Sequence, residues 1–141
     1  STMSMYQYKI KSNFDLVGPI SEEIYEKCRL HNIDEENCNK IDICVIEALN
    51  NVIKHSYKSL PENELSVLLC IDLEKVKLDI SDFGIPRTNL GKACLDFDPE
   101  DITNLPEGGM GLFIIENLMD ETYYISDGKT NVFTLIKYFR K

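Results

Sequence analysis

The sequence predicts an α+β protein built as a two-layer sandwich, with a mixed, mostly antiparallel sheet and helices on one face. Apolar residues recur at helical spacing in three segments, and they alternate or cluster as in strands in five others. The segments follow the order strand, helix, helix, strand, strand, long loop, helix, strand, strand. Helices segregated from hairpin strands in this way favour one helical layer on one sheet. The length of 141 residues favours a single domain over residues 1–141.

The first half of the chain contains one predicted strand and two predicted helices. Residues 5–12 alternate weakly and indicate a strand. Residues 19–31 begin with proline, serine and two glutamates, which is a helix-start signal, and continue with one amphipathic face. A second helix is predicted from residue 34 to about residue 59, before Pro61. Its apolar positions, spaced by three and four, are Cys38, Ile41, Val45, Ala48 and Val52.

The second half contains two predicted hairpins on either side of a loop and a helix. Residues 65–73 and 76–82 are rich in leucine, valine and isoleucine and indicate the first hairpin. Residues 83–109 hold several prolines and glycines, and a loop of this length in a compact domain is usually functional or mobile. Residues 110–120 return to helical spacing. The second hairpin is predicted over residues 121–126 and 131–139.

Composition excludes several classes of function. The formal net charge of −9 argues against nonspecific nucleic-acid binding and against an anionic membrane surface. No apolar run approaches the ~20 residues of a membrane span, and the N-terminus lacks a signal segment. Five cysteines without a CxxC spacing indicate buried free thiols in a reducing compartment, and no zinc site. We therefore expect a cytoplasmic protein with neither a nucleic-acid nor a membrane partner.

Three polar residues of the second predicted helix, Glu47, Asn51 and His55, are four residues apart. At 100° per residue they lie at about 0°, 40° and 80°, beside the apolar face, so they should line the edge of a cleft. The Asn51 oxygen can be a ligand of Mg²⁺, and Glu47 can accept a proton from a nucleophile. Taken alone, the stripe is also typical of a solvated helix edge, because glutamate and asparagine are common on helices.

Two further motifs carry chemistry. Asp82 ends a predicted strand and can accept a hydrogen bond from an exocyclic amine such as that of adenine, while Gly84 allows a close approach of the backbone. The plain alternative is a turn. The Asp82-Phe83-Gly84 tripeptide matches a protein-kinase motif, but the chain is too short for that fold and lacks its other motifs.

The second of these motifs, Gly108-Gly109-Met110-Gly111, precedes a predicted helix, where backbone amides favour phosphate. Its plain alternative is a flexible loop that enters a helix. The chain has no Walker A sequence, which excludes a P-loop NTPase.

Together, the segments 47–57, 82–84 and 107–121 resemble the anti-sigma-factor serine/threonine protein kinases of bacteria, within the histidine-kinase-like ATPase superfamily. The order of elements agrees over almost the whole chain. The resemblance implies a Bergerat-type ATP-binding fold that uses ATP and Mg²⁺. It also implies a protein that binds a sigma factor and phosphorylates a serine on an anti-sigma-factor antagonist of STAS type. A homodimer is expected from the resemblance as well, with residues 5–20 as a candidate interface.

The resemblance also assigns roles to residues. It implies that Glu47 is the general base, Asn51 the Mg²⁺ ligand and Asp82 the residue that binds the adenine amine. Residues 85–107 would form the ATP lid. His55 would lie beside the site without being phosphorylated. The other implied ATP-binding residues are Asn50, Gly84, Gly108, Gly109, Met110 and Gly111.

Two departures from the superfamily pattern keep an alternative open. Pro86 stands where a second glycine is often found, and Leu105-Pro106-Glu107 contains no arginine to contact the γ-phosphate. Charge neutralisation at the transferred phosphoryl group carries much of the catalysis by kinases. The chain could therefore be a non-catalytic ATP-binding module that sequesters a protein partner without phosphotransfer. A third possibility is an ATPase domain of a phosphatase or sensor pathway.

Overall fold

Five strands form a single sheet in the computed structural model, which describes residues 2–87 and 109–139. Their order across the sheet is β1-β2-β3-β5-β4, and every neighbouring pair is antiparallel. The prediction of a mostly antiparallel sheet is confirmed, and the described strands contain no parallel pair. The strands are β1 (Ser4–Lys11), β2 (Glu64–Ile71), β3 (Lys75–Asp82), β4 (Glu121–Ser126) and β5 (Asn131–Tyr138).

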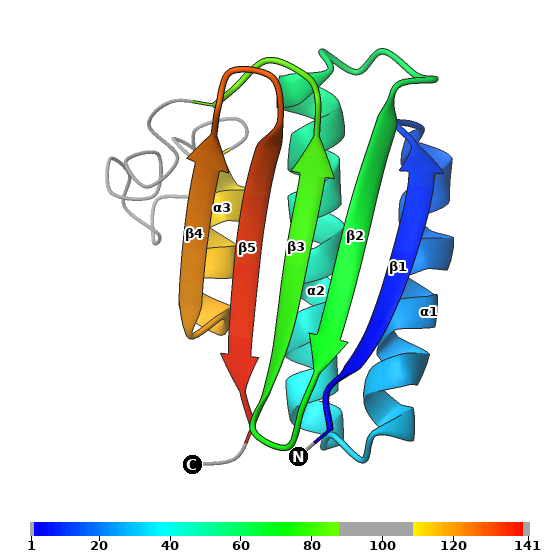
Figure 1. Ribbon diagram of the computed structural model, residues 1–141, viewed down its shortest axis with the longest axis vertical. Coiled ribbons are helices and arrows are strands. Elements are labelled where there is room, and N and C mark those ends of the chain that lie inside the picture. Colours follow the sequence, from blue (N-terminus) through cyan, green and yellow to red (C-terminus); the bar gives the residue numbers. More distant parts are fainter. Residues whose placement is uncertain (1, 88–108, 140–141) are drawn as a thin grey trace.

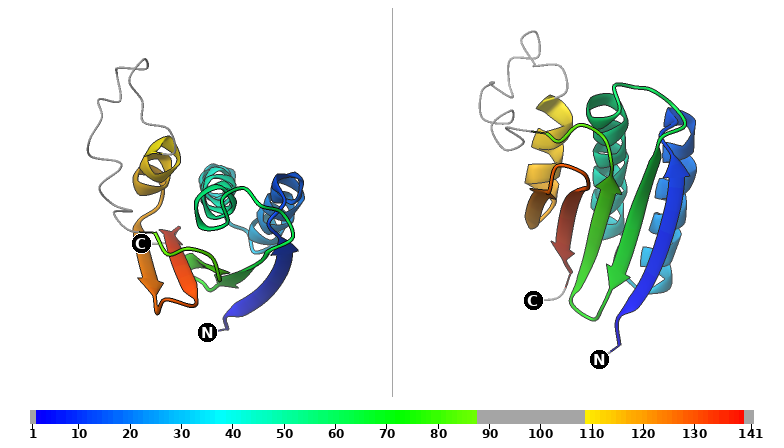
Figure 2. Two further views of the ribbon diagram at one scale, coloured as in Figure 1. Left: turned by 90° about the horizontal axis from the view of Figure 1, so that it is seen from above. Right: turned by 45° about the horizontal axis from the view of Figure 1, so that its top comes forward.

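In the part of the chain that the structure describes, three α-helices cover one face of this sheet, as predicted (Figure 1; Figure 2, left). They are α1 (Val17–Leu30), α2 (Glu35–Asn51) and α3 (Gly109–Leu118). α2 packs between α1 and α3, so the middle of the helical layer is the element that carries Glu47 and Asn51. The start of α2 follows from sequence, because the Asp34 side chain accepts a hydrogen bond from the amide of Asn37.

The core lies between the two layers and follows the predicted periodicities. In β2 and β3, alternate apolar side chains point to the helices and are fully buried. In α2, the buried apolar positions recur at three and four, as the sequence predicts. This packing holds the site-bearing face of α2 at a fixed distance from the end of β3. The central buried residues are Ile41, Val45, Ala48, Leu49, Leu65, Val67, Leu69, Leu78, Ile80 and Leu135.

The end of α2 differs from the prediction of a regular helix to about residue 59. The α-helical hydrogen bonds end at Asn51, and a π-helical segment follows over Val52–Ser56. The amide of Tyr57 donates to the carbonyl of Val52 at 3.2 Å, five residues back. A π-turn widens the helix locally, so extrapolation at 100° per residue fails beyond Asn51. The angle predicted for His55 relative to Glu47 was worked out for a regular α-helix, and it does not apply to this segment.

None of the described helices combines the length and the apolar character that crossing a bilayer requires.

Candidate active site

Glu47 and Asn51 project from α2 toward the first turn of α3. A β-carbon at Gly111 would lie 2.7 Å from Oε2 of Glu47 and 3.1 Å from Nδ2 of Asn51. The first distance is shorter than real β-carbon contacts and the second is tight, so a side chain at residue 111 would displace the Glu47 carboxylate and press on Asn51. The structure thus brings together two motifs that lie far apart in the sequence.

A cleft of about 450 Å³ opens beside these three residues. Its volume is within the range of small-molecule sites. Asn50 and Met110, two further residues expected at the site, contribute to its walls. Its full lining is Phe14, Glu47, Asn50, Asn51, Lys54, Ser59, Met110 and Gly111. The cleft therefore combines a carboxylate, two amides and a lysine with two apolar side chains at its rim.

Asn51 carries a buried, unpaired polar group in this cleft. Its side chain is 8% exposed, and its Nδ2 has no hydrogen-bond partner within the described part of the chain. A buried polar atom left in this way costs about 1–3 kcal/mol. Because an amide can rotate to present either oxygen or nitrogen, Asn51 can turn its oxygen toward a cation or its nitrogen toward a phosphate. A polar ligand in the cleft would remove the cost.

The donor set fits Mg²⁺ bound together with phosphates. The described residues contain no group of three or more His, Cys, Asp or Glu side chains that could hold a metal by themselves. Mg²⁺ usually takes one or two protein oxygens and completes its shell with water and substrate phosphates. An amide oxygen of Asn51 beside a carboxylate is consistent with that kind of site.

Asp82, at the end of β3, is buried with 2% of its surface exposed. One carboxylate oxygen, Oδ1, accepts hydrogen bonds from the backbone of Gly84 and from the side chain of Asn131, each at 2.8 Å. Burial raises the pKa of Asp82 above its ordinary value, and the hydrogen bonds from Asn131, Gly84 and Ser56 oppose that rise. The fixed carboxylate can accept a hydrogen bond from an amine.

Asn131 belongs to this site, and sequence reasoning missed it. It is fully buried at the start of β5, directly opposite Asp82 in the β3–β5 register. Its Nδ2 also donates to the carbonyl of Gly84 at 3.0 Å, and its oxygen accepts from Ser126 at 2.6 Å. In the sequence it is one more polar residue of the turn 127–131. Only the register between strands reveals that it holds the Asp82 turn.

Gly84 lies directly against the end of the Glu47 helix. A β-carbon at this position would be 2.3 Å from the carbonyl oxygen of Ser56. The next amide, of Ile85, donates to that same oxygen at 2.9 Å. The predicted close approach at Gly84 is therefore to the protein's own backbone, which docks the Asp82 turn onto the π-turn.

A second, smaller cavity lies between Asp82 and Asn51, so that Asn51 lines both spaces. Its volume of about 10 Å³ is about that of one water molecule. A purine is much larger, so its entry requires side chains at the rim to move. Tyr124 and Arg87 form part of that rim, and the Arg87 amide donates to the Tyr124 hydroxyl at 2.8 Å. The remaining walls are Ala48, Val52, Ser56, Leu112 and Phe133.

Four further features predicted for the site are His55, Gly109, Gly108 and the lid. His55 is on the π-helical segment and lines neither of these two cavities. Gly109 is the first residue of α3. Gly108 and most of the predicted lid, residues 88–107, lie outside the described residues.

Comparisons with known proteins assign the chain to a family. The histidine kinase-like ATPase domain family matches residues 10–137. A relative named serine-protein kinase RsbW, from Staphylococcus epidermidis, is 39% identical over 109 residues, which cover 70% of this chain and 64% of the relative. The chain thus spans less than two thirds of that relative's length.

Two solved structures share the fold. A chain of the SiaB–SiaC complex from Pseudomonas aeruginosa superposes with a TM-score of 0.62 at 12% identity, covering 94% of this chain and 89% of that one. The histidine kinase AdeS of Acinetobacter baumannii gives a TM-score of 0.52 at 14% identity, covering 100% of this chain and 70% of that one. These two likenesses show the fold, and the match of the family model over residues 10–137 shows that the chain belongs to the histidine kinase-like ATPase domain family, a membership that implies ATP binding.

Proposed function

We propose that this chain is an ATP- and Mg²⁺-dependent protein serine kinase and anti-sigma factor. It would phosphorylate a serine on an anti-sigma-factor antagonist and bind a sigma factor. The observation that carries the proposal is the contact of Gly111 with both Glu47 and Asn51. Through that contact, the candidate base Glu47 and the candidate metal ligand Asn51 lie beside the first turn of α3, and the N-terminus of a helix favours the binding of phosphate. The relative named as a serine-protein kinase supports the choice of acceptor.

Each side chain would have a separate task. Asp82 would accept a hydrogen bond from the adenine amine, and the backbone at Gly111 would approach the phosphates. Glu47 would accept the proton of the serine hydroxyl. At the same time, the serine oxygen would form a bond to the γ-phosphorus, and the bond between the γ-phosphorus and the oxygen that leaves with ADP would break. Asn51 would hold Mg²⁺, which neutralises phosphate charge.

Glu47 is free to act as a base in this arrangement. It is half-buried, and within the described residues no hydrogen bond or ion pair engages its carboxylate. A structural carboxylate at such a position would ordinarily be paired with a donor. The availability of both oxygens supports catalysis over a purely structural role for this residue.

The alternative is a non-catalytic module that binds ATP and sequesters a protein partner. The absence of an arginine in Leu105-Pro106-Glu107 favours it, because less positive charge is then available to the transferred phosphoryl group. Both candidates use residues 1–141 as one domain with residues 85–107 as a lid. Both would also act as homodimers through residues 5–20, a segment in which Met5 and Phe14 are exposed.

A phosphotransfer assay separates the two candidates. The protein is mixed with Mg²⁺ and ATP labelled at the γ-phosphate, together with candidate antagonist proteins, and the products are analysed for phosphoserine. The kinase proposal expects label on one serine of the antagonist. ATP binding measured by calorimetry without any transfer would support the binding module and refute the kinase.

A further inference from the structure

Tyr57 joins two parts of the candidate site without lining either of the cavities beside Asn51. It follows the π-helical segment directly, and its side chain is 8% exposed. Its hydroxyl donates to the carbonyl of Glu64 in β2 at 2.6 Å and accepts from the amide of Phe83 at 2.8 Å. One hydroxyl therefore ties the end of the Glu47 helix to β2 and to the turn that follows Asp82.

The ring of Tyr57 makes a further contact with that turn. A β-carbon at Gly84 would lie 2.9 Å from Cδ1 of Tyr57, and the carbonyl of Ser56 accepts from the amide of Ile85 at 2.9 Å. The turn is thus held by its two backbone amides on either side of Gly84. Burial raises the pKa of Tyr57, so the hydroxyl keeps its proton at neutral pH and can donate and accept together.

The backbone after Tyr57 is strained, which indicates that its position is determined by more than local preference. Lys58 and Ser59 have φ angles of 54° and 61°, and the amide of Ser59 donates to the carbonyl of Ile53 at 2.8 Å. Left-handed conformations of such residues cost about 1–3 kcal/mol each and persist where surrounding contacts enforce them. The amide of Leu60 also donates to the carbonyl of Tyr57 at 2.9 Å, so main-chain hydrogen bonds hold this segment on both sides of the two residues.

We propose that Tyr57 is a positioning residue for adenine recognition, an inference that rests on the proposed ATP site. By holding the amide of Phe83 and the backbone of Gly84, Tyr57 fixes the Gly84 amide that donates to Oδ1 of Asp82. The orientation of the Asp82 carboxylate relative to Asn51 and Glu47 then depends on the tyrosine hydroxyl. Tyr57 would act through this turn and would touch no ligand.

The test compares two purine nucleotides that differ at the group Asp82 recognises. ATP carries an exocyclic amine, and ITP carries an oxygen in its place. In Tyr57→Phe, we expect the affinity for ATP to fall about tenfold, the affinity for ITP to change little, and the ATP-to-ITP ratio to fall accordingly. Calorimetry with Mg²⁺ measures both. An unchanged ratio, even with lower stability, would overturn the proposal, because a merely structural tyrosine weakens both nucleotides alike.

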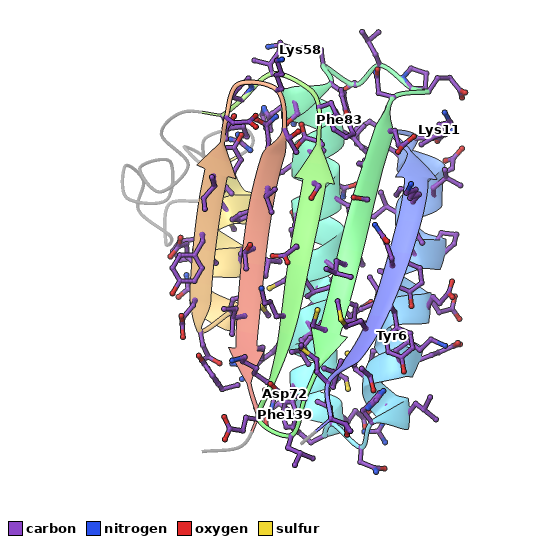
Figure 3. All side chains as sticks on the ribbon, viewed as in Figure 1. Tyr6, Lys11, Lys58, Asp72, Phe83 and Phe139 are labelled. Carbon is purple, nitrogen blue, oxygen red and sulfur yellow. The ribbon has the colours of Figure 1, made fainter. Side chains whose placement is uncertain are left out.

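Tyr6→Phe is the matched control. Its hydroxyl makes a hydrogen bond of 2.8 Å to Nε2 of His31. Figure 3 shows Tyr6 toward the opposite end of the sheet from Phe83 and Lys58. This variant should leave the ATP-to-ITP ratio at the wild-type value, and a shift equal to that of Tyr57→Phe would count against the proposal.

Hydrogen exchange in the wild-type protein gives a second reading that does not depend on a variant. Without nucleotide, the Phe83 amide should exchange as slowly as amides within β3, because the Tyr57 hydroxyl protects it. Fast exchange of that amide would refute the arrangement. Failure of the ATP-site proposal has a different signature, since the wild-type protein would then bind neither nucleotide by calorimetry.

Discussion

Gly111 faces Glu47 across the contact between α3 and α2, and a β-carbon at position 111 would lie 2.7 Å from Oε2 of the glutamate. The missing side chain is therefore what allows the carboxylate to sit at the first turn of α3. Glycine normally weakens a helix by about 0.5–1 kcal/mol relative to alanine. At position 111, however, an alanine would displace the carboxylate of Glu47, the candidate base.

The first prediction concerns Gly111→Ala. The added methyl group should push the Glu47 carboxylate aside and lower phosphotransfer by about 100-fold, with the fold retained by circular dichroism. Transfer to the antagonist at saturating ATP is the measurement. Gly18→Ala in α1 is the control, because a β-carbon there meets nothing within 4 Å. Equal activity of both variants would contradict the close contact at Gly111.

The second prediction concerns Glu47→Gln. The amide keeps the shape of the side chain and cannot take up a proton, so ATP affinity should stay near wild type while transfer falls by about 10²–10⁴-fold. Calorimetry gives the first quantity, and initial rates of serine phosphorylation give the second. Glu26→Gln, on the exposed side of α1, serves as the control. Undiminished transfer by Glu47→Gln would remove the glutamate from the mechanism.

The third prediction concerns Asn131→Ala. Loss of the two donated hydrogen bonds leaves Asp82 and the carbonyl of Gly84 buried with fewer partners, which should destabilise the fold by about 1–3 kcal/mol and weaken ATP binding. Urea denaturation and calorimetry provide the two values. The matched control is Asn117→Ala, whose amide donates to the Phe113 carbonyl on the exposed side of α3. If the two asparagines were equivalent, the proposed support of Asp82 would be wrong.

The fourth prediction concerns the buried thiols. Burial raises the pKa of Cys28 and of Cys44 to about 12 in each case, and it also raises the pKa of Cys38 and Cys70. All four should therefore remain protonated and unreactive toward Ellman's reagent at pH 8 while the protein is folded. The experiment uses Cys94→Ser, since residue 94 lies outside the described residues. Rapid reaction before unfolding would contradict the buried arrangement.

The parts of the structure that follow local rules were predictable from sequence. The capping aspartate at position 34 and the spacing of apolar residues place α2, and the alternation in β2 and β3 places their buried faces. Because Glu47 and Asn51 are one turn apart on a regular helix, their shared face is fixed by geometry alone. The meeting of these residues with Gly111 was expected only through a family resemblance.

The features that were missed depend on contacts between distant segments. The π-turn after Asn51 is coupled to the docking of Gly84 on Ser56, and neither helix propensity nor periodicity encodes that docking. Asn131 shares a site with Asp82 because the β3–β5 register sets them opposite each other. A polar residue at the end of a turn does not reveal its register in a single sequence. In the sequence, Tyr57 is only the last residue of the segment 47–57, whereas in the structure it links three segments.

The fifth prediction concerns Asp82→Asn and its dependence on pH. Since burial raises the pKa of Asp82 in the folded state, the folded protein binds this proton more readily than the unfolded chain, whose ordinary value is 3.8. Stability then falls as pH rises from the unfolded value through the folded one, and the loss is complete above the folded pKa. Asparagine carries no charge and avoids this loss. The free energy of unfolding of the variant should therefore exceed that of the wild type at neutral pH by about 1 kcal/mol, a typical gain for a single stabilising substitution.

Urea denaturation at several pH values between 3.8 and neutrality tests this sign, because the advantage of Asp82→Asn should shrink as the pH falls toward the ordinary value. Asp72→Asn is the control, because the pKa of Asp72 is shifted in the opposite direction and the expected change in stability has the opposite sign. Backbone amides of Glu74 and Lys75 lower the pKa of Asp72, so the wild-type carboxylate stabilises the fold above its unfolded pKa. Asp72→Asn should be less stable than wild type at neutral pH, and its deficit should vanish on acidification. A neutral-pH loss of stability in Asp82→Asn would show that its hydrogen bonds outweigh the cost of its burial, and the carboxylate would then be a structural group.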